Sequence, residues 1–169
     1  MKLPYSIALS VPLLGTSAMA ADLSVKIEIP QLNVAEYHRP YVATWLERPD
    51  GSVVTNLSML HEVRKKDGGA KYFKDVRTWW RKVGRDVTLP MDGVSGATRG
   101  PGEATLSFPA AKPVLDKLPA GEYVVLVEAA REGGGREVVR VPLHWGKGAQ
   151  TVQAKGKEEL VNVTVQVKP

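Results

Sequence analysis

Apolar and polar residues alternate with a period of two over much of the chain. In LSVKIEI, residues 23–29, every second side chain is aliphatic, and VNVTVQV, residues 161–167, repeats the pattern near the other end. This alternation is typical of a β-strand with one buried and one solvated face. Further strand candidates lie between them: Tyr41 to Glu47, Ser52 to Leu60, Ala104 to Phe108, Glu122 to Ala130 and Glu137 to Trp145.

Turn signals separate several of these segments. Pro49-Asp50-Gly51 predicts a hairpin turn between the second and third strands, and Gly133-Gly134-Gly135 joins two later ones. Short strands divided by such turns favour an antiparallel β-sandwich, immunoglobulin-like in broad architecture. We therefore expect a mostly β fold with a single short helix.

The helix is expected where the period changes. In KYFKDVRTWWRKVG, residues 71–84, apolar side chains recur every three or four residues, and basic side chains fill the other side. This spacing predicts an amphipathic helix of about three or four turns. Gly84 stands where a glycine C-cap belongs. The apolar stripe should lie on the sandwich or over one of its ends.

The N-terminus has the features of a secretory signal peptide. Lys2 is followed by an apolar run and by Ala18-Met19-Ala20, with small residues at the two positions that a signal peptidase reads. Cleavage after Ala20 leaves residues 21–169, which have the length of one β-sandwich domain. No other apolar stretch is long enough to span a bilayer. We expect an exported, soluble, periplasmic protein.

The lack of cysteine and the excess of basic residues restrict which cofactors and ligands the protein could bind. The chain has no cysteine, which excludes disulfides, a lipoprotein anchor and haem attached through Cys-x-x-Cys-His. The formal net charge is +5, and residues 62–99 hold ten Lys and Arg against five Asp and Glu. In an exported protein we take this basic segment to indicate an anionic ligand such as a phosphate, and not nucleic acid.

The basic segment runs into the most specific motif, MDGVSGATRGPG, residues 91–102. Residues 92–98, DGVSGAT, match the pattern Asp-x-x-(Ser/Thr)-Gly-Ala-Thr at every specified position. The motif resembles the flavinylation sites of membrane-bound quinone reductases and electron-transport flavoproteins. There, an FAD:protein FMN transferase of the ApbE type joins the FMN phosphate to the hydroxyl of the last threonine.

The resemblance implies a role for each motif residue. Thr98 supplies the hydroxyl nucleophile, and Gly96 and Ala97 let the modifying enzyme approach the backbone closely. Asp92 is a recognition or metal-proximal carboxylate, while Ser95 donates to the incoming phosphate or fixes the loop. Four arginines are candidates to pair with the phosphodiester: Arg77, Arg81, Arg85 and Arg99.

A tethered flavin also needs an aromatic platform. Trp79 and Trp80 are the candidates, with Tyr72 behind them. Adjacent helical residues point in different directions, so the two tryptophans cannot face one pocket equally. The alternative is that both anchor the helix in the core. The basic surplus would favour the anionic reduced flavin and raise its potential.

Four phrases in order, HRPYVATWLERPDG, DVRTWWRK, DGVSGATRGPGEATL and PAGEYVVLVEAARE, carry a second resemblance over residues 37–145. They are similar to a family of predicted periplasmic proteins of unknown function, often encoded beside PepSY-type membrane reductases and flavin transferases. The resemblance implies a redox carrier with covalent FMN. Its partners would be the FAD:protein FMN transferase and a PepSY-type membrane reductase, and it would not itself be an enzyme.

Two other functions remain open. A non-redox periplasmic adaptor with an immunoglobulin-like fold would use the loop to contact a protein partner. A metal- or haem-binding accessory protein would use His38, His61 and His144, but these lie in different strands without the spacing of a metal pair. Each histidine is therefore expected to be hydrogen-bonded or solvent-facing.

Two charged runs are expected to be solvated. Residues 64–69, RKKDGG, have the composition of an exposed turn, and Glu158-Glu159 would contribute solubility where the last strand begins.

Overall fold

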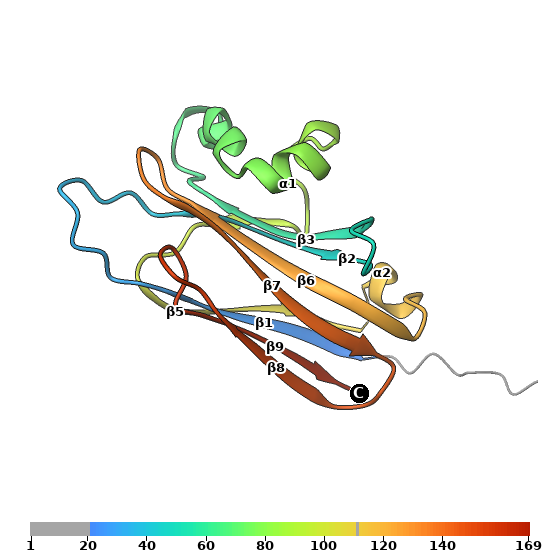
Figure 1. Cartoon of the computed structure of the whole chain (residues 1–169). Coiled ribbons are helices and arrows are strands. Elements are labelled where there is room, and N and C mark those ends of the chain that lie inside the picture. Colours follow the sequence, from blue (N-terminus) through green and yellow to red (C-terminus); the bar gives the residue numbers. More distant parts are fainter. Residues whose placement is uncertain (1–20, 111) are drawn as a thin grey trace, which may run out of the picture.

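Two β-sheets pack face to face, and a layer of short helices covers one of them (Figure 1). The computed structural model describes residues 21–110 and 112–169, so the predicted signal peptide, residues 1–20, lies outside the described residues. The elements in chain order are β1 (Asp22–Ile29), β2 (Tyr41–Glu47), β3 (Val53–His61), the 3₁₀ segment η1 (Lys66–Asp75), α1 (Arg77–Lys82), η2 (Gly84–Asp86), β4 (Ser95–Ala97), β5 (Gly102–Phe108), α2 (Pro113–Asp116), β6 (Gly121–Ala130), β7 (Arg136–Trp145), β8 (Gln150–Lys155) and β9 (Asn162–Lys168).

The two sheets differ in size. The four-stranded sheet has the order β5–β1–β9–β8, and the five-stranded sheet has the order β4–β3–β2–β6–β7. The paired strands of the described chain are antiparallel except for β3 and β4, which run parallel. The mostly β sandwich is confirmed, and one parallel pair at its edge is an addition to the prediction.

The main core fills the space between the sheets. Val25 and Ile27 of β1 and Val163 and Val165 of β9 are fully buried there. The residues between them in these strands are half-buried or exposed, because the other face of the four-stranded sheet is uncovered. The alternation in the sequence is therefore the direct consequence of a sheet covered on one side.

The five-stranded sheet is covered on both sides. All seven residues of β2 are buried, because η1 and α1 pack on the face turned away from the other sheet (Figure 1). This second core contains Trp45 and Met59 from the sheet and Val76 and Trp79 from the helical layer. The prediction that the apolar stripe would lie on the sandwich is confirmed.

The helix itself is shorter than predicted. Residues 71–84 form the end of η1, then α1, then the start of η2, with a break at Val76, whose ψ of 69° is not helical. Gly84 directly follows the C-cap residue Val83, the position expected for a helix-ending glycine, but it is not among the glycines with a positive φ that such a cap adopts. A Cβ on Gly84 would lie 2.6 Å from the ring of Trp79 and 2.7 Å from that of Trp80. Glycine is therefore required here by close packing.

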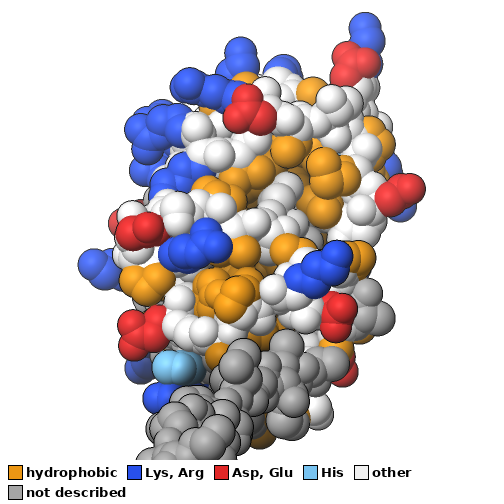
Figure 2. All heavy atoms as spheres, turned by 90° about the vertical axis from the view of Figure 1, so that its right-hand side faces the viewer, with side chains coloured by type: hydrophobic (Ala, Val, Ile, Leu, Met, Phe, Trp, Pro, Cys, Tyr) orange, Lys and Arg blue, Asp and Glu red, His pale blue; other side chains and the backbone are white. Residues whose placement is uncertain are grey.

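One end of the sandwich has a partly apolar surface (Figure 2). At the end where β1 begins and β9 ends, apolar side chains lie between scattered basic ones (Figure 2). A cleft of about 470 Å³ there is lined by side chains that include Leu23, Phe108 and Pro109. The 91–102 motif lies toward the other end, where β3 finishes and β4 runs beside it.

Candidate functional site

The motif forms the edge of the five-stranded sheet. The glycine-rich sequence of residues 91–102 predicts a loop, but Ser95–Ala97 form strand β4, which pairs with the last three residues of β3. The turn before β4 is closed by Ser95, whose Oγ accepts the Met91 amide at 2.9 Å. Ser95 therefore fixes the loop, one of the two roles expected of it.

Thr98 lies directly after this strand and is buried. Its amide donates to the His61 carbonyl at 2.9 Å, and its hydroxyl donates to the Pro40 carbonyl. The residue is only 4% exposed. The hydroxyl that the resemblance implies as the FMN attachment point is therefore hydrogen-bonded and covered in this structure. Among the described residues, β4 is the outermost strand of its sheet.

The other motif residues lie around the edge strand. Asp92, Ala97 and Arg99 are exposed, as a recognition surface requires. Gly96 is held tightly, since a Cβ there would lie 3.0 Å from Cδ2 of Leu60. Gly93 has a φ of 69° in the tip of the turn, a conformation that favours glycine. Close packing thus accounts for glycine at position 96, and the turn conformation accounts for glycine at position 93.

Trp79 is a core residue in this structure. It is fully buried, its amide donates to Oε2 of Glu128 at 2.7 Å, and its indole Nε1 donates to Oδ1 of Asn56 at 3.1 Å. Trp80 is half-buried, with ring centroids 6.4 Å apart between the two indoles. Trp79 therefore anchors α1, which matches the alternative considered from the sequence and leaves no free face for a flavin.

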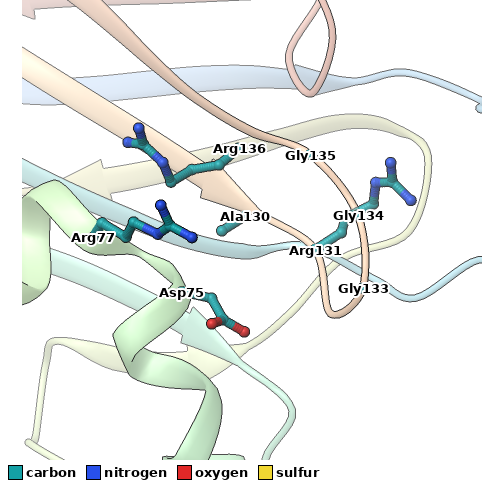
Figure 3. Close-up of a pocket in the computed structure, with 8 residues that line it drawn as sticks. All are labelled: Asp75, Arg77, Ala130, Arg131, Gly133, Gly134, Gly135 and Arg136. Carbon is teal, nitrogen blue, oxygen red and sulfur yellow. The ribbon is translucent and has the colours of Figure 1, made fainter.

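The arginines expected to meet the phosphate are not gathered at the motif. Arg81 and Arg85 are exposed on α1 and η2, and Arg99 is exposed beside Thr98. Arg77 lines a pocket of about 320 Å³ between α1 and the β6–β7 hairpin, together with Asp75 and Arg136 (Figure 3). Of the four candidates, Arg99 is the one the sequence itself places next to Thr98.

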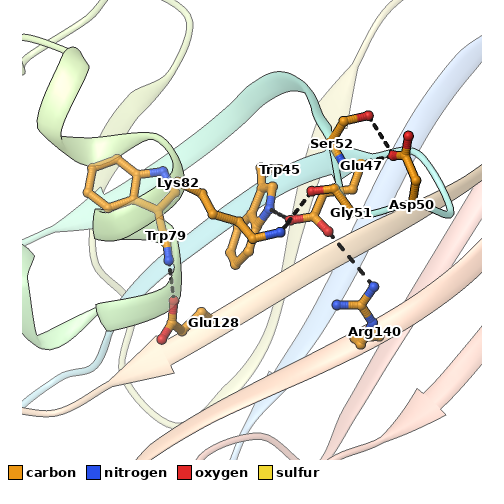
Figure 4. A network of polar contacts seen from close by, with 9 residues as sticks. All are labelled: Trp45, Glu47, Asp50, Gly51, Ser52, Trp79, Lys82, Glu128 and Arg140. Atoms are coloured by element: carbon orange, nitrogen blue, oxygen red, sulfur yellow. Dashed lines mark hydrogen bonds and ion pairs between the residues drawn. The ribbon is translucent and has the colours of Figure 1, made fainter.

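Two buried carboxylates that the sequence analysis missed hold the helical layer on the sheet (Figure 4). Glu128 accepts the amides of Thr78 and Trp79 at 3.0 and 2.7 Å, and Arg136 donates to it at 2.8 Å. Glu128 thus caps the first turn of α1 from the neighbouring sheet. The available signal was a single acid within the apolar strand segment VVLVEAA.

Glu47 is the second buried carboxylate. Its Oε1 accepts the indole of Trp45 and the ammonium of Lys82, both at 2.7 Å, and Arg140 lies 3.8 Å from Oε2. Lys82 also donates to the Gly51 carbonyl in the β2–β3 turn at 2.8 Å (Figure 4). Together these contacts join the end of α1 to the hairpin.

The prediction that Glu159 is solvated is wrong. It is buried, not solvated, and Arg131 binds it with two hydrogen bonds of 2.7 and 2.9 Å. This bidentate pair raises the pKa of Arg131 and joins the β6–β7 hairpin to the segment before β9. Arg131 consequently points away from Arg77 and Asp75, although it lines the same pocket (Figure 3).

The segment between β3 and α1 makes several hydrogen bonds to the rest of the fold. The Gly68 carbonyl lies 2.8 Å from Nδ1 of His61, and the Gly69 carbonyl accepts the hydroxyl of Tyr41 at 3.2 Å. Lys65 and the hydroxyl of Tyr72 both bind Glu132. Arg64, Lys66 and Asp67 are exposed, as predicted for a solvated turn, whereas Gly69 is buried and contradicts that prediction.

The three histidines do not form a cluster. His61 is buried under the β3–α1 segment, His38 has Nε2 3.2 Å from Oε1 of Glu36, and His144 is half-buried in β7. In residues 21–110 and 112–169, no group of three or more His, Cys, Asp or Glu side chains is arranged to hold a metal ion.

The fold and site define a β-sandwich with a helical cover and a polar motif on its edge strand. Residues 22–162 match the family described as "Predicted periplasmic protein (DUF2271)", and because the match spans most of the chain, the protein belongs to this family. No curated protein and no solved structure gives a significant match. The family description agrees with the predicted periplasmic location. None of the helices in the described ranges has the length and apolar character needed to cross a bilayer.

Proposed function

We propose that this protein is an exported electron carrier with FMN esterified to Thr98 by an FAD:protein FMN transferase. The observation that carries the proposal is the position of the complete motif, on a three-residue edge strand with Thr98 directly after it. A short edge strand with few hydrogen bonds opens at a fraction of the free energy of global unfolding. The proposal takes the cover of Thr98 to open together with this edge strand.

The closed edge does not accept the modification. A phosphate on Thr98 cannot share the space of the hydrogen bond between its hydroxyl and the Pro40 carbonyl, and the residue is almost fully covered. The proposal therefore requires Thr98 to leave Pro40, either by opening of β4 in the folded protein or before the edge closes during folding. Gly93 and Gly100 flank the segment and give it freedom to move.

The transfer balances without a redox change. The hydroxyl oxygen of Thr98 attacks the FMN phosphorus of FAD, the bond between that phosphorus and the oxygen of the AMP phosphate breaks, and AMP leaves. The hydroxyl proton is released in the same reaction. Exposed Asp92 and Ala97 would meet the transferase, while Arg99 would lie beside the negative charge that the phosphodiester keeps.

The attached flavin would accept and donate electrons one or two at a time, and the protein chain would hold it in position. Under this proposal, a PepSY-type membrane reductase delivers the electrons, and an extracytoplasmic acceptor removes them. The protein catalyses no reaction alone, since it is the substrate of the transferase and the redox partner of others.

The burial of Thr98 favours a second candidate function, a non-redox periplasmic binding or adaptor module. In that case the glycines and Ser95 serve only to shape the turn and to fit β4 against Leu60. Exposed residues of the edge would then contact a protein partner.

Co-expression with a flavin transferase in an export-competent host distinguishes the electron carrier from the adaptor module. The electron carrier would be yellow, Thr98→Ala would be colourless, and Thr88→Ala, at an exposed threonine outside the motif, would stay yellow. A colourless wild-type protein, made while the transferase modifies another target in the same cells, would reject flavinylation and leave the adaptor.

A further inference from the structure

The excess of basic residues is concentrated in the helical layer formed by η1, α1 and η2. The formal net charge of the whole chain is +5, and residues 62–99 alone hold ten Lys and Arg against five Asp and Glu, so the charges of the other residues balance. The acids on the three helical elements are Asp67, Asp75 and Asp86. The helical layer is therefore the positive part of an otherwise neutral chain.

Most of these basic side chains are not neutralised by the sheet beneath them. Lys65, just before η1, pairs with Glu132, and Lys82 of α1 pairs with Glu47. The other basic residues of the helical layer are exposed and form no ion pair within residues 21–110 and 112–169: Lys66, Lys71, Lys74, Arg77, Arg81 and Arg85. Their charges are therefore available to an anionic partner.

The basic side chains lie on the side of the helical layer that is turned away from the core. Phe73, Val76 and Trp79 of the same segment are buried in the second core, against the five-stranded sheet. Arg77 and Arg81 are exposed and lie one helical turn apart on α1. Lys and Arg side chains gather at the top and upper left of Figure 2, at the height at which Figure 1 shows the helical layer.

The opposite face of the sandwich, on the four-stranded sheet, has no such excess. The charged residues of its four strands balance: Lys26, Lys155 and Lys168 against Asp22, Glu28 and Glu103. Lys26 also forms an ion pair with Glu103 at 2.8 Å. The molecule is therefore electrically asymmetric, and an anionic surface would attract it with the helical layer foremost.

Two partly exposed aromatic rings lie among the basic residues. Tyr72 and Trp80 are half-buried, whereas the other three tryptophans, Trp45, Trp79 and Trp145, are buried. Rings with an apolar body and a polar edge favour the boundary between water and lipid headgroups. Basic side chains with such rings between them therefore favour a surface of anionic phospholipids over an acidic protein, for which charge alone would suffice.

We propose that the helical layer docks the protein on the surface of a membrane that contains anionic phospholipids. The headgroup phosphates pair with the exposed ammonium and guanidinium groups, while the sandwich stays in water. The family description, a predicted periplasmic protein, agrees with a location next to a membrane. The inference does not depend on flavin attachment, although docking would hold an electron carrier close to a membrane-bound reductase.

Sedimentation with vesicles tests the docking. The exported protein should sediment with vesicles of equal parts phosphatidylglycerol and phosphatidylcholine but not with phosphatidylcholine alone, and high salt should release it. Arg77→Gln and Arg81→Gln should each weaken partitioning about fivefold, the equivalent of about 1 kcal/mol for one basic residue near an anionic surface. The matched control, Lys155→Gln, removes the same charge from the opposite sheet and should bind like the wild type. Absence of binding to the anionic vesicles, or equal losses in Arg81→Gln and Lys155→Gln, overturns the proposal.

A second experiment identifies the face and the kind of anion. Trp80 is the only tryptophan that is not buried, so its fluorescence emission should shift to shorter wavelength with anionic vesicles and not with inorganic phosphate. Trp80→Phe should lose the shift but still sediment. A shift that persists in Trp80→Phe would show that another tryptophan meets the lipid and would reject the helical layer as the docking face. Binding to polyglutamate without binding to the vesicles would identify an acidic protein partner and overturn docking on lipid.

Discussion

The hydroxyl of Thr98 donates a hydrogen bond to the carbonyl of Pro40, 58 residues earlier in the chain. This bond fastens the end of the edge strand β4 to the start of the central strand β2. The proposed function makes the same hydroxyl the nucleophile that receives FMN. Whether the folded edge opens therefore decides if FMN could be attached to the folded protein or only before the edge closes during folding.

Hydrogen exchange measures that opening directly. The Thr98 amide, bonded to the His61 carbonyl, should exchange at least about a hundredfold faster than the protected amides of β2, corresponding to roughly 3 kcal/mol in opening free energy. The reason is that β4 is short and lies at the edge, whereas β2 is central and buried on both faces. Exchange of Thr98 only at the rate of global unfolding would show that the folded edge stays closed.

Removal of the Glu128 carboxylate should destabilise the protein, because this side chain holds α1 on the sheet. Glu128→Ala leaves the amides of Thr78 and Trp79 and the guanidinium of Arg136 without their acceptor. We expect a loss of about 3 kcal/mol in the free energy of unfolding. Urea unfolding followed by tryptophan fluorescence measures it, because Trp79 reports on α1.

The matched control for Glu128 is Glu158→Ala, at an exposed acid, which should change stability by less than about 0.5 kcal/mol. Similar values for the two variants would contradict the role of Glu128 as the acceptor that holds α1 on the sheet.

Gly84 should not tolerate a methyl group. Gly84→Ala places a Cβ against the rings of Trp79 and Trp80, so it should cost about 2 kcal/mol through overpacking. Gly100→Ala is the control, since its Cβ would have its nearest neighbour, Nε of Arg39, at 3.9 Å. Thermal unfolding of both variants compares them, and a neutral Gly84→Ala would show that the tryptophans have room to move.

Glu137 should make stability depend on pH in the acid range. Burial opposes ionisation of Glu137, but the amides of residues 157–160 donate to its carboxylate, and together they hold its pKa below the usual value. A carboxyl group with a lowered pKa contributes stability above its unfolded pKa of about 4.3, and the contribution is lost as pH falls through the folded pKa.

The test compares wild type with Glu137→Gln across this range. At pH 7 the variant should be less stable by about 2 kcal/mol, and the difference should shrink on acidification below about pH 4. Unfolding free energies at several pH values check this, and a difference that grows as the pH falls would contradict it.

Most strands were predictable because a strand with one buried face has alternating apolar and polar residues in its sequence. The bounds expected for β2 agree with the structure, and those for β6 and β7 differ by one residue at the start. Two strands were missed. β4 has only three residues, and β8, Gln150–Lys155, alternates half-buried and exposed residues without the aliphatic pattern of β9.

The chemistry at the site was less predictable, since it depends on pairing across long sequence distances. Glu159 appeared solvated beside Glu158, but Arg131, 28 residues earlier, binds it in the fold. Likewise, the motif identified Thr98 without indicating that Pro40 would cover it. The apolar spacing of Trp79 was visible, whereas its hydrogen bonds to Glu128 and Asn56 were not.

Intact mass of the exported protein, after co-expression with an active FAD:protein FMN transferase, tests the central claim most directly. The account predicts a gain equal to one FMN less one water in the wild type, located on Thr98 by peptide fragmentation and absent from Thr98→Val. An unmodified wild-type mass, or the same gain in Thr98→Val, would contradict it.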